Sequence, residues 1–157
     1  EDAIPPAPGG RSRPRDSPES AVRVIADTNV VAYYLLGTEP FIEELGRFWR
    51  HGVEPSAPAS WEAEITNVLW LAARRGVVSE DGARLRHDAA DRLGIESVPV
   101  RALWNGALAR AQQTGVPAHD TLFVELAVRR RLPLATFDST LLEKFPKVAR
   151  RPRALVG

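Results

Sequence analysis

Short runs of β-branched and apolar residues alternate along this chain with longer segments of helical periodicity. The strand-like runs cover residues 22–26, 95–100 and 132–136, with a weak one at 154–156. Helical patterns cover about 29–37, 41–52, 60–76, 79–94, 103–115, 119–131 and 139–145. Repeated strand-then-helix units predict an α/β fold with a mainly parallel sheet and helices on both faces. Ligands of such sheets bind beyond the carboxyl ends of the strands, so functional residues are expected there.

The composition is that of an ordinary globular protein and excludes several classes of site. The chain has 157 residues, of which 44% are hydrophobic, enough for one domain with a real core. It has no Cys, which excludes a disulfide scaffold, a zinc–thiolate site, an iron–sulfur cluster and a thiol nucleophile. The formal net charge is only +1, so any contact with nucleic acid must depend on local patches.

Residues 1–20 differ from the remainder because they are rich in proline and poor in apolar side chains. Such a stretch cannot bury enough surface to offset its ordering entropy, so we predict a flexible arm there and a folded domain over 21–157. A segment that wraps a neighbouring subunit is the other interpretation. The longest apolar run, 30–36, is too short to cross a bilayer, and no signal-peptide layout opens the chain. We therefore expect a cytoplasmic protein.

Two acidic residues follow predicted strands. Asp27 comes directly after the first strand, and Asp138 follows the strand at 132–136 with one residue between. Both are expected near the carboxyl edge of the sheet. Each position also precedes a predicted helix, and aspartate is a favoured N-cap, so helix capping is the alternative for either residue alone.

Two further acids lie on the apolar faces of predicted helices. Glu64 shares its stripe with Ile65 and Val68, and Asp120 shares a face with Phe123, whereas Glu125 points the other way. A carboxylate on a core-facing stripe is costly to bury unless it is paired or binds a metal. The alternatives are a salt bridge to an arginine for Glu64 and stabilisation by the helix dipole for Asp120.

These four acids are predicted to converge on one cleft. Carboxylates 4 Å apart repel by about 4 kcal/mol per pair at an effective dielectric constant of 20, so an ionised cluster requires a cation. All-oxygen ligands select hard ions, which indicates Mg²⁺ or Mn²⁺. Carboxylate-held ions of this kind commonly act on phosphates, and one or two of them can hydrolyse a phosphodiester.

Four short motifs occur in a characteristic order: VIADTN at 24–29, EITNVL at 64–69, HDTL at 119–122 and LATFD at 134–138. In this order and spacing the chain resembles the PIN-domain ribonucleases, especially the VapC-type toxins of toxin–antitoxin pairs. The resemblance covers about residues 22–145.

The resemblance implies a three-layer α/β/α sandwich and a Mg²⁺- or Mn²⁺-dependent endoribonuclease, the toxin of a type II toxin–antitoxin pair. By position, the metal-binding and catalytic acids would be Asp27, Glu64, Asp120 and Asp138. Thr28, Asn29 and Thr136 match polar positions that commonly support the site. The resemblance also implies an RNA substrate, a cognate antitoxin and a homodimer. The Pro-rich arm departs from the family pattern.

Two other functions compete with this interpretation. A haloacid-dehalogenase-type phosphatase needs a second aspartate two residues after the first, but that position is Asn29. A non-catalytic RNA-binding or interaction domain on the same fold is the stronger alternative. Trp70, opposite the core stripe of its helix, is a candidate for a protein interface.

Overall fold

The computed structural model describes residues 21–157, so the predicted arm at 1–20 lies outside the described residues. Within this range a five-stranded parallel sheet has the order β3-β2-β1-β4-β5. Its strands are β1 (Arg23–Ala26), β2 (Glu54–Pro58), β3 (Glu96–Val98), β4 (Leu134–Ala135) and β5 (Ala149–Arg150). The predicted α/β class and parallel sheet are therefore confirmed.

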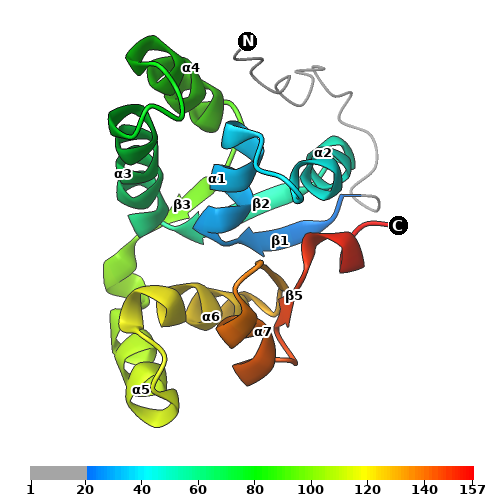
Figure 1. The fold of residues 1–157 in the computed structure, drawn as a ribbon. Helices are drawn as coiled ribbons and strands as arrows, with labels where there is room; N and C mark the ends of the chain where they lie inside the picture. Colours follow the sequence, from blue (N-terminus) through cyan, green and yellow to red (C-terminus); the bar gives the residue numbers. More distant parts are fainter. Residues whose placement is uncertain (1–20) are drawn as a thin grey trace.

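Helices cover both faces of the sheet (Figure 1). On one side lie α1 (Thr28–Leu36), α2 (Ile42–Arg50), α3 (Ser60–Arg74) and α4 (Glu80–Asp91). On the other lie α5 (Trp104–Thr114), α6 (Ala118–Arg130) and α7 (Ser139–Lys144). Two 3₁₀ turns, η1 (Val100–Ala102) and η2 (Pro152–Ala154), complete the described elements. This arrangement is the three-layer α/β/α sandwich that the resemblance implied.

The core follows from the apolar strands and the helix stripes that cover them. Val24, Ile25 and Ala26 of β1 are all buried, as expected for the central strand of a sheet that is covered on both faces. On α3, Ile65 and Leu69 are buried, and α6 is buried along most of its length. The apolar stripe predicted on α3 therefore packs, whereas α6 is buried on more sides than predicted, since Glu125 is buried as well.

Three details of the strand and cap prediction are wrong. β2 was not predicted because its sequence, EPSAP, holds two prolines and little apolar surface. The weak strand predicted at 154–156 is replaced by the 3₁₀ turn η2, and the fifth strand is instead the two-residue β5. Serine is a favoured N-cap residue, which predicts that Ser60 caps the helix expected at 60–76, but the N-cap is Ala59, which makes no side-chain hydrogen bond.

Within residues 21–157, no helix combines the length and apolar character that a membrane crossing requires.

Candidate active site

The sheet order places the predicted site residues at one edge. β1 lies between β2 and β4, so the carboxyl ends of these three parallel strands are neighbours. Asp27 follows β1, helix α3 with Glu64 begins just after β2, and Asp138 follows β4. Helix α6 contacts β1, β2 and β4 from the other face and carries Asp120 in its first turn. Acids from four segments therefore lie at the carboxyl edge.

Asp27 is the buried centre of this edge, with 7% of its surface exposed. Its Oδ1 accepts a hydrogen bond from the Thr28 backbone N–H at 2.8 Å, and its Oδ2 accepts one from the Thr136 hydroxyl at 2.7 Å. Burial raises the pKa of Asp27 to about 7, against the lowering effect of these two bonds. The charges of Asp120 and Glu64 raise it further.

Asn29 and Thr136 join the ends of β1 and β4. The Asn29 amide nitrogen lies 3.4 Å from both Asp27 Oδ2 and Thr136 Oγ1, and its Oδ1 accepts from the Phe137 N–H at 3.3 Å. Thr136 Oγ1 also accepts from the Asp138 N–H at 3.0 Å. These bonds fix Asp27 relative to the segment that carries Asp138. Asn29 and Thr136 therefore both contact Asp27, and their supporting role in a site stays a prediction.

Glu64 is half-buried on α3, and its Oε1 is fully buried without a hydrogen-bond partner among the described residues. Burial raises the pKa of Glu64, whereas the nearby hydroxyls of Thr28 and Ser60 and the charge of His119 lower it. Asp120 raises it again. Within residues 21–157 no arginine neutralises Glu64, so the salt bridge weighed from the sequence does not form there.

Asp120 and Asp138 complete the acidic edge. Burial raises the pKa of Asp120, His119 lowers it, and the charge of Asp138 raises it. His119 Nε2 lies 3.6 Å from Asp120 Oδ1 on the exposed side. Asp138 also caps α7, since its Oδ1 accepts from the Leu141 N–H at 3.0 Å. The capping alternative is therefore true of Asp138, and it coexists with its electrostatic contact to Asp120.

The donor set of this edge suits a hard cation by its chemistry. The carboxylates raise one another's pKa values, and Glu64 presents a buried oxygen without a partner. In the described part of the chain, no three Asp, Glu or His side chains are close enough together to hold an ion as they stand. Mg²⁺ is nevertheless commonly bound by only one or two carboxylates and several waters. The edge therefore fits a partly hydrated ion better than a closed cage of protein ligands.

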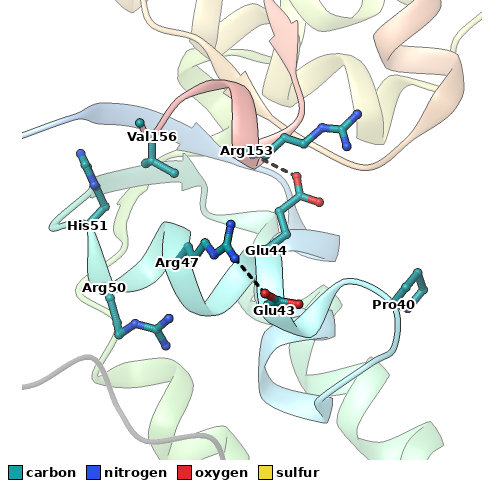
Figure 2. A pocket seen from close by; sticks show the side chains of 9 residues that line it. Pro40, Glu43, Glu44, Arg47, Arg50, His51, Arg153 and Val156 are labelled. Atoms are coloured by element: carbon teal, nitrogen blue, oxygen red, sulfur yellow. Dashed lines mark hydrogen bonds and ion pairs between the residues drawn. The ribbon is translucent and has the colours of Figure 1, made fainter.

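A cavity of about 550 Å³ lies elsewhere, between α2 and the C-terminal segment (Figure 2). It is lined by Pro40, Glu43, Glu44, Arg47, Arg50, His51, Arg153, Val156 and Gly157. Its acids are already engaged: Glu43 pairs with Arg47, and Glu44 accepts from the Arg153 N–H and the Arg151 side chain. Figure 2 shows the Arg50 and Arg153 side chains pointing in different directions, so this cavity does not gather a set of groups for chemistry.

Sequence reasoning missed Ser60 as a member of this edge. It was interpreted as a helix cap, but its hydroxyl is buried beside Glu64. The signal was present, because residues four apart on a helix share a face. Trp70 is 56% exposed, as predicted for a residue opposite the core stripe.

Comparison of the fold with solved structures supports the α/β class defined above. The chain superimposes with a TM-score of 0.57 on a chain of a toxin–antitoxin complex from Klebsiella pneumoniae, at 15% identity, covering 82% of this chain and 97% of that one. It superimposes with a TM-score of 0.56 on a chain of VapBC2 from Rickettsia felis, solved with a DNA fragment from its promoter. In that match the identity is 11%, with 83% of this chain and 98% of that one covered. At these identities the likeness establishes the shared fold. No protein-family profile and no curated protein matches the sequence.

Proposed function

We propose that this protein is a Mg²⁺- or Mn²⁺-dependent endoribonuclease and the toxin of a toxin–antitoxin pair. The observation that carries the proposal is an acidic edge with no arginine or lysine partner among residues 21–157. Asp27, Glu64 and Asp120 lie within electrostatic reach of one another there, and each has a raised pKa. The likeness to chains of toxin–antitoxin complexes supports the biological assignment.

In the proposed mechanism, a bound divalent ion supplies positive charge that stabilises the transition state of phosphodiester hydrolysis and lowers the pKa of water. Asp27, which is held by Thr28 and Thr136, would be the central ligand of this ion, and Glu64, Asp120 and Asp138 would complete the set. Burial raises the pKa of Asp27 to about 7, so near neutral pH this carboxyl would have to lose a proton in order to hold a cation. Thr136 and Asn29 keep its Oδ2 in place while this happens.

The expected partners are an RNA substrate, a cognate antitoxin and a second copy of the chain. Exposed apolar side chains are available for protein contacts, among them Trp70 at 56% exposure and Leu108 at 53%. The structure favours no single patch among them.

The test is cleavage of a folded RNA by the purified protein with Mg²⁺, with Mn²⁺ and with EDTA, beside Asp27→Asn. We expect defined cuts that require the metal and disappear in the variant. Asp91→Asn is the matched control, because Asp91 is exposed on α4 and the same substitution there should leave cleavage unchanged.

Two results would contradict the proposal. RNA binding without cleavage under any divalent ion would favour the non-catalytic RNA-binding alternative. Absence of both metal binding and cleavage would mean that the acidic edge has a structural role.

A further inference from the structure

Three buried polar atoms for which residues 21–157 provide no hydrogen-bond partner gather at the carboxyl edge between β1 and β2. They are the hydroxyl oxygens of Thr28 and Ser60 and the Oε1 atom of Glu64. Buried polar atoms in folded proteins nearly always have a hydrogen-bond partner, so three exceptions at one place require an explanation. They complement one another chemically, because two hydroxyls can donate and a carboxylate oxygen can accept.

The fold brings these atoms together by a repeated local geometry. Thr28 and Ser60 are each the first residue of a helix, and each lies two residues beyond the end of its strand. β1 and β2 are paired in parallel, with Ile25 opposite Ser56, so the two helix starts are neighbours. α1 and α3 also pack against each other, and Glu64 lies one turn after Ser60 on α3. Both hydroxyls therefore face the same carboxylate.

The burial of the Glu64 side chain is uneven. Oε1 is sealed from solvent, whereas the Glu64 side chain as a whole is only half-buried, so the exposed part of this residue lies away from Oε1. No hydrogen bond of ordinary geometry joins the three partnerless atoms, yet both hydroxyls lie near enough to lower the pKa of Glu64. A hydroxyl can direct its proton toward Oε1 once a shift of the side chains brings the two oxygen atoms into hydrogen-bond geometry.

We propose that Thr28 and Ser60 are positioning residues that hold Oε1 of Glu64 by two donated hydrogen bonds and keep Oε2 turned toward the neighbouring carboxylates. Hydroxyl donors behind a charged oxygen stabilise it in one orientation. This inference deepens the proposed function, because it assigns the groups that orient one member of the acidic edge. Its effect on the cation rests on that function, but its effect on Glu64 does not.

The first test is Mn²⁺ binding, measured by calorimetry or electron paramagnetic resonance. Partners that orient metal ligands change metal affinity by roughly 10–100-fold when removed. We expect about a 10-fold loss for Ser60→Ala and for Thr28→Val, which keeps the shape of threonine and removes its hydroxyl. Thr28→Ser retains the hydroxyl and should restore affinity. Thr66→Val is the matched control, because the Thr66 hydroxyl on the same helix donates to the Glu62 carbonyl instead.

The second test needs neither metal nor activity. In EDTA, the urea denaturation midpoints of Ser60→Ala, Glu64→Met and the double variant form a mutant cycle. Glu64→Met keeps the side-chain length and removes both acceptors. We expect non-additive changes, with Ser60→Ala lowering the midpoint only when Glu64 is present.

The outcomes separate the two proposals. Wild-type affinity for Mn²⁺ in Ser60→Ala and Thr28→Val would overturn the positioning role and leave the proposed function intact. If the wild-type protein does not bind Mn²⁺, the proposed function fails, and the mutant cycle alone tests whether Ser60 holds Glu64. An additive cycle would overturn the positioning role whatever the metal does.

Discussion

Helix α6 carries two carboxylates five residues apart, and their surroundings shift their pKa values in opposite directions. Asp120 faces the carboxyl edge of the sheet, where acids raise one another's pKa values. Glu125 faces α5 and is buried with 7% exposure, but Arg110 and Arg129 contact its two oxygens at 2.8 and 2.7 Å. Burial raises the pKa of Glu125, and the two arginines outweigh it, so the net shift is downward.

This difference shows that arginines are available on α6. A shortage of basic side chains therefore does not explain why the acids of the carboxyl edge have no arginine partner. The same helix supplies Arg129 to Glu125, and Arg130 pairs with Glu96 at 2.7 Å. The fold thus neutralises a buried carboxylate where the pairing is structural. The arginines of α6 pair away from the carboxyl edge, where the basic neighbour from this helix is His119, 3.6 Å from Asp120. A cluster left in this state destabilises the metal-free protein, which is expected of a site that binds a cation.

The largest expected effect separates the two regions by activity. Asp27→Asn should lower the rate of metal-dependent RNA cleavage about 10³-fold or more, equivalent to about 4 kcal/mol of activation free energy, because the central ligand is lost. Glu125→Gln should leave cleavage within a few-fold of wild type in protein that remains folded. Single-turnover cleavage assays measure both. Equal losses of cleavage rate in Asp27→Asn and Glu125→Gln would mean that the acidic edge is no more important for cleavage than the ion-paired Glu125.

The next effect is a pH dependence of stability whose sign separates the two regions, because the pKa values of the acidic edge are raised and that of Glu125 is lowered. The pKa of Asp27 is 3.8 when unfolded and about 7 when folded, so between these values the native state holds a proton that the unfolded state releases. The free energy of unfolding in EDTA should therefore fall as pH rises from 4 to 7, by up to about 1.4 kcal/mol per unit, and level off above 7. Urea denaturation across this range measures it.

Asp27→Asn is the variant that sharpens this result, since it cannot titrate and should give a shallower profile. Glu64 and Asp120 have pKa values shifted in the same direction, so some slope should remain. Identical profiles for the wild type and Asp27→Asn would mean that Asp27 does not carry the proton.

Most residues of the acidic edge could be predicted from the sequence, but the ion pairs that Glu125 makes with Arg110 and Arg129 could not. Asp27, Glu64 and Asp120 could be placed because each follows a clear strand or sits on an apolar helical stripe. The partner of Glu125 could not be predicted, since Arg110 comes from a different helix and pairing across helices depends on how they pack. β2 escaped detection because a strand buried by its neighbours needs little apolar sequence of its own.

We expect a loss of stability of intermediate size when the ion pairs of Glu125 are broken. Glu125→Gln removes the charge that engages Arg110 and Arg129, and hydrogen bonds to charged groups contribute about 1.5–3 kcal/mol each. Both arginines are partly exposed, which reduces the loss, so we expect about 2 kcal/mol from urea denaturation. Arg84→Met, which breaks an exposed pair with Asp81, is the control and should change stability by less than about 0.5 kcal/mol. If Glu125→Gln left the free energy of unfolding unchanged, the ion pairs of Glu125 would not be stabilising, and the contrast drawn with Asp120 would be wrong.

The smallest effect tests why α5 approaches α6 at a glycine. A Cβ atom added at Gly106 would overlap the carboxyl group of Glu125, so Gly106→Ala must displace that side chain from its arginines. Overpacking of this kind is destabilising by about 1–3 kcal/mol, and the better helix propensity of alanine returns about 1 kcal/mol, which leaves a loss of about 1 kcal/mol. In a Glu125→Ala background the overlap disappears and only the propensity remains, so the same substitution should become stabilising. A loss in both backgrounds would show that the glycine serves the helix contact itself rather than the ion pair.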